Sequence, residues 1–410
     1  MVSVFADLEK MPGFVAGKKR STGRNMCFTN LANQDKLTCL QNNHFFASEV
    51  LENDDSPILP GLPDDVAKHC LALVPRSNVP TIGGVCKRWR SFIQSKEFIT
   101  VRKLAGMVEE WLYFLTMDTE GEGTHWEVMD RPSHRCQALP PMPGPVKAGF
   151  GVVVLNGKLL LLLDIQLQIE VPLPQQRFTI MTRSSTRCND IVTFIYVSDP
   201  TCWSRLSKMN VARYDFACAE VNGLVYAVGG YGLDGEILSS AEVYDPDTNK
   251  WTLIESVRRP RWGCFACSLD GKLYVMGGRS SFTIGNSKFV DVYDPEVHSW
   301  GEFKNGCVMV TAHAVLGKKL FCMEWKNQRK LAIFCSEDNL WKMVPLPLTG
   351  SSSVDFRFGI FDEKLLLFSL EAGPSYQTLL YDPNAAKGSE WQISDIKPSG
   401  VFLCSVTIKA

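Results

Sequence analysis

Short apolar stretches alternate with tight polar turns over most of the chain, and one arrangement of them recurs. Residues 221–230 (VNGLVYAVGG) are echoed 48 residues later by residues 269–278 (LDGKLYVMGG). Each copy is followed by Tyr-Asp-Pro and then by a tryptophan, Trp251 or Trp300. Asn-Gly and Asp-Gly supply the positive φ of a tight hairpin, and the diglycine lets the backbone turn where a side chain would clash. A repeat of this length built from short strands predicts a mainly β fold of the β-propeller type.

The spacing of tryptophans divides the chain into repeats. Trp203, Trp251, Trp300, Trp341 and Trp391 mark five complete blades, which we place at about 148–210, 211–258, 260–305, 307–348 and 353–398. The stretch 108–144 offers only three strands, and the tail 399–410 offers a fourth. Because an open sheet edge invites aggregation, we expect the two ends to form one composite blade. The prediction is a six-bladed ring over 108–410, although the loss of one degenerate blade would give five.

One interval breaks the repeat. Cys136 stands where a tryptophan would be expected, and it lies 67 residues before Trp203. The excess falls in 165–190, where the diglycine should stand. This segment is either a long loop that contacts a partner or an irregular insertion, including a splicing or gene-model variant. The rarity of long structureless loops favours the insertion.

The N-terminal part of the chain follows other patterns. Residues 1–56 lack periodicity and predict a disordered arm. Residues 57–101 carry apolar residues at helical spacing and predict a domain of three short helices. Such a domain is too small to bury all its apolar surface alone, so a partner or the next domain should cover part of it. The three predicted helices are marked by Val66, Cys70 and Leu73, by Ile82, Val85, Cys86 and Trp89, and by Phe92, Ile93 and Phe98.

Composition narrows the function. The net charge of −1 gives no reason to expect nucleic acid or a membrane as partner, and the 14 cysteines show no zinc-binding spacing. The six histidines form no metal-ligand pattern, and no nucleophile elbow, phosphate-binding loop or dinucleotide motif stands in a suitable context. We therefore expect no catalytic residues, no metal and no cofactor. Without a visible signal peptide, a cytoplasmic or nuclear location is expected.

Two stretches resemble known modules. Leu59-Pro60-Gly61-Leu62-Pro63-Asp64-Asp65, followed by Val85-Cys86-Lys87-Arg88-Trp89-Arg90, resembles the F-box, and the repeats with Gly-Gly, Tyr-Asp-Pro and Trp resemble kelch repeats. Together they resemble a plant-type F-box/kelch-repeat protein. The resemblance implies that the F-box docks on the Skp-type adaptor of an SCF (cullin-RING) ubiquitin ligase, and that the propeller recruits a protein for ubiquitylation. The alternative is a kelch binding scaffold that works without the ligase. Some kelch propellers are copper oxidases, but we find no converging set of Tyr and His ligands.

The resemblance assigns ten residues to adaptor binding: Leu59, Pro60, Leu62, Pro63, Asp64, Val66, Pro75, Val85, Cys86 and Trp89. The alternative for Val66, Leu73, Val85 and Trp89 is that they form the core of the helical domain itself. Gly83 and Gly84 inside the second predicted helix each cost about 1 kcal/mol of helix propensity.

Candidate substrate contacts are predicted from residues that stand at equivalent positions in successive repeats. Arg213-Tyr214 and Arg261-Trp262 stand just before the inner strand of their blades, and arginine beside an aromatic ring suits recognition. His313 and Arg357 lie near the matching phase of later blades. The alternative, which the repetition itself favours, is that the arginines are architectural and pair with a neighbouring carboxylate or carbonyl group.

Overall fold

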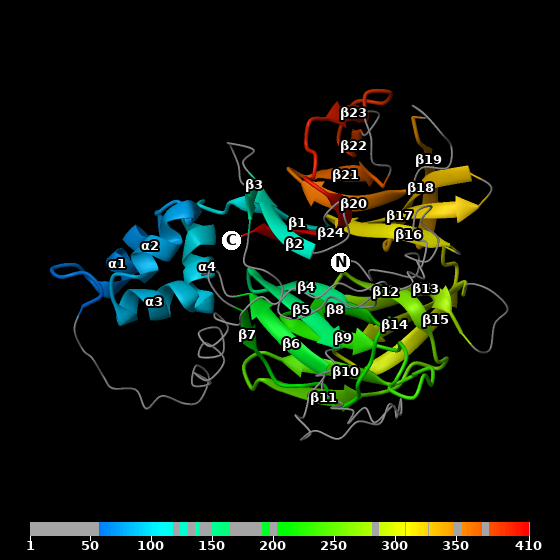
Figure 1. The fold of residues 1–410 in the computed structure, drawn as a ribbon, viewed down its shortest axis with the longest axis horizontal. Helices are drawn as coiled ribbons and strands as arrows, with labels where there is room; N and C mark the ends of the chain where they lie inside the picture. The colour runs from blue at the N-terminus through cyan, green and yellow to red at the C-terminus, as the bar shows by residue number, and fades with distance from the viewer. Residues whose placement is uncertain are drawn as a thin grey trace, which may run out of the picture.

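The computed structural model places a helical domain beside a β-propeller (Figure 1). It describes residues 57–117, 124–129, 136–138, 150–164, 191–196, 203–280, 287–307, 309–326, 328–347, 355–370 and 377–409. The predicted arm 1–56 and the irregular segment 165–190 lie outside the described residues. None of the described helices is long and apolar enough to cross a membrane.

The helical domain contains more helices than the three predicted. It has four α-helices and one 3₁₀ turn: α1 (Asp64–Ala72), η3 (Arg76–Asn78), α2 (Val79–Gly83), α3 (Lys87–Gln94) and α4 (Lys96–Leu104). Their shared core consists of Ile58, Ala67, Leu71, Ala72, Val79, Phe92, Ile93 and Phe98. The last helix extends three residues beyond the expected boundary at 101.

The prediction of one helix through Ile82, Val85, Cys86 and Trp89 was wrong. The chain leaves helical geometry after Gly83 and restarts at Lys87, and the Cys86 Sγ accepts a hydrogen bond from the Trp89 backbone N–H. The weak helix propensity of the two glycines and this cap favour the break. In the same way Ser95 caps α4 through the Phe98 N–H, so the third predicted segment is two helices.

The described strands form six four-stranded antiparallel sheets. The first sheet consists of β24 (Val401–Lys409), β1 (Glu110–Met117), β2 (Thr124–Met129) and β3 (Cys136–Ala138). The second consists of β4 (Gly151–Leu155), β5 (Lys158–Asp164), β6 (Ile191–Tyr196) and β7 (Trp203–Arg205). The third consists of β8 (Ala217–Val221), β9 (Leu224–Val228), β10 (Ala241–Asp245) and β11 (Lys250–Ile254).

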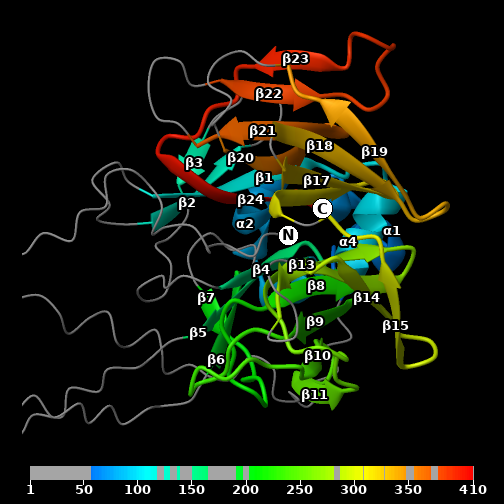
Figure 2. The ribbon, with the colours of Figure 1, turned by 90° about the vertical axis from the view of Figure 1, so that its right-hand side faces the viewer.

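The other three sheets have the same up-and-down order. The fourth sheet consists of β12 (Trp262–Leu269), β13 (Lys272–Arg279), β14 (Phe289–Asp294) and β15 (Ser299–Lys304). The fifth consists of β16 (Val310–Leu316), β17 (Lys319–Lys326), β18 (Gln328–Cys335) and β19 (Leu340–Pro345). The sixth consists of β20 (Phe356–Phe361), β21 (Lys364–Ser369), β22 (Thr378–Tyr381) and β23 (Trp391–Ser394). Strands β20 to β23 lie successively farther from the middle of the ring, as Figure 2 shows.

The sheets are arranged in a ring that the C-terminal strand closes. The inner strands β4, β8, β12, β16, β20 and β24 contact one another in that order, and β24 contacts β4 again. Strand β24 pairs with β1 from Glu110 opposite Lys409 to Met117 opposite Val401. The predicted pairing of the tail with the first strand of the ring is therefore confirmed. Joining the two ends of the domain in one sheet removes the open edge that a linear array would expose.

Turn chemistry explains the regularity of the best-formed repeats. Asn222-Gly223 and Asp270-Gly271 all have positive φ, as the predicted hairpin turn requires. Gly278 also has positive φ, and a Cβ there would lie 2.3 Å from the Trp262 carbonyl oxygen. The diglycine thus lets the second strand end in close contact with the first.

The tryptophans join neighbouring sheets. Trp251, Trp300 and Trp341 each pack against an aromatic ring of the adjacent strand, with centroid distances of 5.0 to 5.3 Å. Each indole N–H donates to a backbone carbonyl of the chain that leaves the preceding sheet, such as Ser207 (3.2 Å) and Glu255 (2.7 Å). The tryptophan therefore fills the space between sheets and also satisfies its one polar group there.

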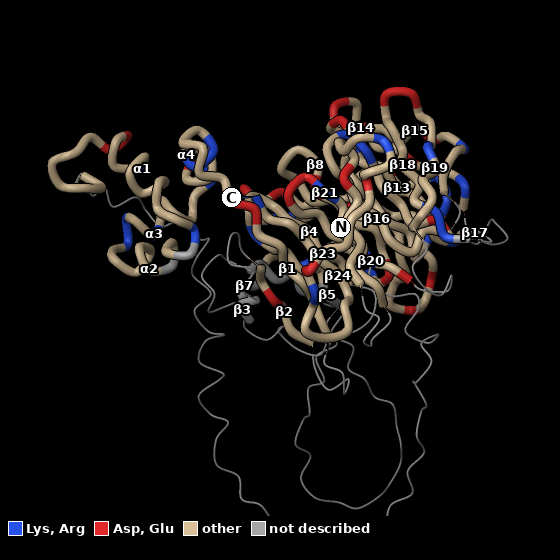
Figure 3. The backbone as a smooth tube through the Cα atoms, turned by 90° about the horizontal axis from the view of Figure 1, so that it is seen from above, with Lys and Arg blue, Asp and Glu red and all other residues tan. Residues whose placement is uncertain are grey.

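The helical domain meets the ring at one particular edge. Lys96 forms an ion pair with Asp247 in the β10–β11 turn, and the Lys158 ammonium, at the start of β5, lies 3.4 Å from the Gln94 carbonyl oxygen. Both ring residues stand at the edge that carries the hairpin turns between the first and second strands and between the third and fourth. Helix α4 is the helix nearest the ring in Figure 3.

A buried arginine fixes the connection between the two domains. Arg102 on α4 is 1% exposed and donates to the carbonyl oxygens of Ala72, Val74 and Met107 at 2.6–3.0 Å. It also reaches Glu109 at 3.2 Å, one residue before β1. The end of α1, helix α4 and the start of the ring are thereby held together.

Candidate functional site

The helical domain exposes apolar side chains that its core does not use. Leu62, Val66, Leu73 and Val85 are 39, 42, 45 and 61% exposed. Helix α1 buries Ala67 and Leu71 inward, so the stripe of Val66, Cys70 and Leu73 points outward. The structure thus contradicts the alternative that Val66, Leu73 and Val85 form the domain core. We name Leu62, Val66, Leu73 and Val85 the exposed apolar set.

The extended segment before α1 is held in place by polar contacts. The Asp64 carboxylate accepts a hydrogen bond from the Ile58 N–H (2.9 Å) and pairs with Arg88 (2.8 Å). The Trp89 indole N–H donates to the Ile58 carbonyl oxygen (2.8 Å). Of the predicted adaptor contacts, Asp64 and Trp89 therefore position this segment, and the half-buried Leu59 packs on the helical core.

The remaining predicted adaptor residues are open to a partner. Pro60, Leu62, Pro63, Val66, Pro75, Val85 and Cys86 are all exposed. Leu73 is exposed as well but was not among the predicted contacts, although its spacing from Val66 and Cys70 placed it on the same helix face. In Figure 1 the segment before α1 lies at the end of the helical domain that points away from the ring.

At the ring, the structure contradicts two of the predicted substrate contacts directly. Arg213 and Arg261 are each 1% exposed. Arg213 donates to the Gly229 and Ser240 carbonyl oxygens (both 2.9 Å) and to Glu242 (2.8 Å). Burial lowers the pKa of Arg213, and the Glu242 carboxylate counteracts that shift.

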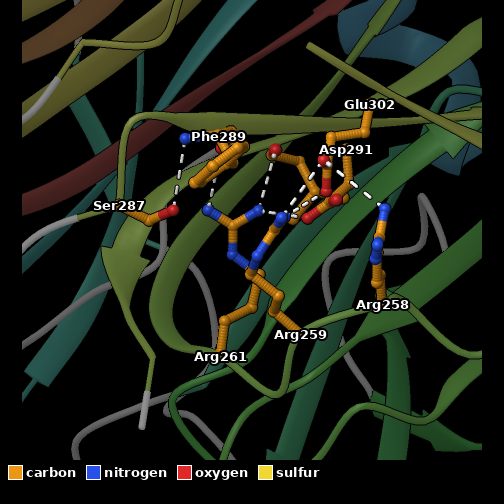
Figure 4. A network of polar contacts seen from close by, with 8 residues as sticks. Arg258, Arg259, Arg261, Ser287, Phe289, Asp291 and Glu302 are labelled. Atoms are coloured by element: carbon orange, nitrogen blue, oxygen red, sulfur yellow. Dashed lines mark hydrogen bonds and ion pairs between the residues drawn. The ribbon is translucent and has the colours of Figure 1, made fainter. Parts of the chain in front are cut away.

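Arg261 repeats the arrangement in the next sheet. It pairs with Asp291 and donates to the Gly277 carbonyl oxygen (2.6 Å). Figure 4 shows it beside Arg259, whose ion pair with Glu302 is more exposed. Both arginines are therefore architectural: they tie the first strand of a sheet to its third. A side chain enclosed in this way presents no donor to a partner protein.

The later-blade candidates are not exposed contacts either. His313 is the fourth residue of β16, stacks on Phe265 at 4.2 Å, and is 5% exposed. Burial lowers its pKa well below the ordinary value, so the imidazole group of His313 is neutral. The half-buried Arg357 donates to the Thr311 carbonyl oxygen (2.7 Å) and so supports the backbone of the neighbouring sheet.

The aromatic residues that follow the two arginines in the sequence, Tyr214 and Trp262, are at least partly exposed. Tyr214 is 38% exposed and stacks on Tyr231 at a centroid distance of 5.2 Å, and Tyr231 meets Trp262 at 5.3 Å. We name Tyr214, Tyr231 and Trp262 the three-ring cluster. Tyr231 was not predicted, yet it directly follows the repeated diglycine, at the position where the next repeat has Arg279. The residue after the diglycine differs between the two repeats, and this difference was the sequence signal that could have identified Tyr231.

The described residues hold no group of three or more His, Cys, Asp or Glu side chains able to bind a metal ion. The helical domain exposes apolar side chains, and the ring exposes aromatic and polar ones.

Comparisons with known proteins agree with both halves of the structure. The F-box domain family matches residues 59–100, and the Kelch motif family matches 212–258 and 260–301. F-box/kelch-repeat protein At1g67480 of Arabidopsis thaliana is 54% identical over 97% of this chain and 99% of its own length. Putative F-box/kelch-repeat protein At1g27420 of the same plant is 39% identical over 88% and 99%.

A solved structure of YjhT aligns with 59% of this chain and 82% of its own, at 15% identity and a TM-score of 0.44. A likeness at that level adds nothing to the fold described above. The sequence relatives, in contrast, extend over both the helical domain and the ring. The chain belongs to the plant F-box/kelch-repeat family.

Proposed function

We propose that this protein is the substrate-recognition subunit of an SCF-type cullin-RING ubiquitin ligase. The F-box docks on a Skp-type adaptor, and the propeller recruits a protein for ubiquitylation. The observation that carries the proposal is the exposed apolar set on a domain whose own core is already complete. Unpartnered apolar side chains of this size gathered on so small a domain mark an interaction surface.

The arrangement of the two domains supports the same role. The helical domain contacts the hairpin-turn edge of the ring through Asp247 and Lys158. The three-ring cluster stands at the other ends of the strands, where inner strands begin and second strands end. A bound adaptor would therefore leave the cluster free. The Arg102 contacts hold the two domains in a fixed relation, which a receptor needs in order to present its substrate.

The proposal is tested by ubiquitin transfer in a reconstituted ligase. Purified full-length protein is incubated with adaptor, cullin-RING module, E1, E2 and ubiquitin, and modification of the chain itself is followed. We expect adaptor-dependent modification of the wild type and its loss in a Val66→Asp/Val85→Asp variant. Both side chains are exposed, so the double variant should fold.

A matched control is available on the same domain. Leu104 on α4 is apolar and 82% exposed but is not part of the exposed apolar set. The Leu104→Asp variant should be modified as fast as the wild type. Modification that needs no adaptor, or that is equal in all three proteins, contradicts the proposal and favours a scaffold that works without the ligase.

A further inference from the structure

The three-ring cluster spans two neighbouring sheets at one edge of the ring. Tyr214 precedes β8, Tyr231 follows β9, and Trp262 opens β12. Tyr214 and Tyr231 exchange two backbone hydrogen bonds of 3.0 and 2.8 Å, and Gly230 of the first sheet donates to the Arg261 carbonyl oxygen of the second at 2.8 Å. The backbone beneath the rings is thus held by hydrogen bonds, and the contacts between the rings make the cluster a preformed aromatic surface.

A carboxylate without a complete set of partners lies beside these rings. Asp215 has positive φ, and its Oδ1 is buried with no hydrogen-bond partner. Its Oδ2 lies 3.4 Å from where a Cβ of Gly263 would stand, which places the carboxylate against the β12 backbone one residue after Trp262. Burial raises the pKa of Asp215 to about 7, and burial together with the Asp215 charge raises the pKa of Tyr231. A buried carboxylate oxygen without a hydrogen-bond partner is costly, so its presence calls for an explanation.

The charges near the cluster are predominantly negative. Asp215 directly follows Tyr214 and acts electrostatically on Tyr231, and Asp234 and Glu236 lie on the loop that follows Tyr231. Arg279, opposite Trp262 in the β12–β13 pair, is the one described cation whose charge acts on Tyr231, and it is exposed. Among the described residues, none forms an ion pair with Asp215.

The ring contains a filled version of the same arrangement. At the corresponding ends of strands two sheets further on, the Arg329 guanidinium lies over the Trp325 ring at 4.5 Å and pairs with Asp355 at 3.0 Å. There the chain itself supplies a cation to an aromatic ring and a carboxylate. At the three-ring cluster, no described lysine or arginine lies over the rings.

We propose that the three-ring cluster and Asp215 bind a lysine or arginine side chain of the recruited protein. The rings attract the cation through their faces, and the negative charge of the Asp215 carboxylate beside them attracts it as well. The proposal rests on the proposed function, because it names the substrate feature that the receptor reads. It assigns recognition to Tyr214, Tyr231, Trp262 and Asp215 and leaves Arg213 and Arg261 as supports beneath them.

A random peptide library displayed on phage, with blocked termini, tests the proposal. The library is selected on immobilised full-length protein at pH 8, and the selected peptides are then synthesised for affinity measurement. We expect enrichment of lysine or arginine at one position. An Asp215→Asn variant should lose affinity for these peptides by about tenfold or more, because it removes the negative charge that attracts their basic side chain. Replacing the single basic residue of a selected peptide by norleucine or citrulline should have a similar effect.

Two further variants distinguish the roles of nearby charges. Glu337→Gln removes one exposed carboxylate from the β18–β19 turn, at the opposite edge, and should leave affinity unchanged. Arg279→Ala removes the competing cation and should strengthen binding. Selection of acidic peptides, selection without a basic preference, a library from which nothing is enriched, or equal affinity of the Asp215→Asn variant would each overturn the inference. Because the F-box takes no part, failure here is independent of a failed ubiquitin-transfer test.

Discussion

Replacing Arg213 by methionine tests whether the repeated arginines hold the ring together. In the wild type, the side chains of Arg213 and Glu242 are both fully buried and 2.8 Å apart. The Arg213→Met variant fills most of the same space but leaves the Glu242 charge without its cation. Removing one partner of a buried ion pair costs about 3–5 kcal/mol. Glu242 keeps the N–H groups of Asn210 (2.7 Å) and Val211 (3.0 Å), so we expect the lower end, about 3 kcal/mol.

The measurement is the free energy of unfolding in urea, followed by tryptophan fluorescence. Adding Glu242→Gln to Arg213→Met removes the stranded charge while retaining an oxygen that accepts from one of the two N–H groups. We expect the double variant to recover at least about 1 kcal/mol of that loss. Peptides selected on the wild type should bind the folded variant unchanged. A loss below about 0.5 kcal/mol for Arg213→Met, the range of ordinary surface substitutions, would refute the architectural role.

Three further outcomes follow from burial and backbone geometry. Gly278→Ala should cost more than about 2 kcal/mol in urea unfolding, whereas Gly223→Ala, with similar positive φ but no atom within 4 Å of its Cβ, should cost about 1 kcal/mol. Because burial raises the pKa of Asp215 from 3.8 to about 7, the native state binds that proton more tightly, and wild-type stability falls as pH rises through this range. Asp215→Asn should therefore melt at a higher temperature than wild type above pH 7, with the difference vanishing below pH 3.8; equal melting curves at all pH values would contradict the raised pKa. A thiol reagent should label Cys70 and Cys86, the exposed cysteines of the described part, before any buried thiol. Adaptor should slow that labelling, and unchanged rates would argue against docking on this face.

Local chemistry made the ring predictable. Asn222-Gly223 and its counterpart demand positive φ wherever they occur, so the repeat shows the hairpins before any tertiary contact is considered. The closing strand was predictable by a different route, because three strands at one end and one at the other leave an edge unless they pair. The arm and the segment 165–190, where no repeat pattern exists, carry no comparable signal.

The errors have physical causes that sequence spacing does not contain. The helix break at Cys86 depends on a side-chain cap that competes with an acceptable apolar pattern. The inward orientation of Arg213 depends on a carboxylate 29 residues away, and only the fold brings Glu242 beside it. Spacing identified the stripe of Val66, Cys70 and Leu73 correctly, but only the packing of Ala67 and Leu71 shows that the stripe faces outward.

The affinity of the full-length protein for a Skp-type adaptor, measured by isothermal titration calorimetry, tests the central claim most directly. The account predicts saturable one-to-one binding by the wild type and by Leu104→Asp. It predicts an increase in Kd of at least about thirtyfold for Val66→Asp/Val85→Asp, equivalent to about 2 kcal/mol for a charge placed at the centre of an apolar interface. Circular dichroism and urea unfolding establish that the variants are folded. No binding by the wild type, or equal Kd values for all three proteins, would contradict the claim that the exposed apolar set couples this propeller to a ubiquitin ligase.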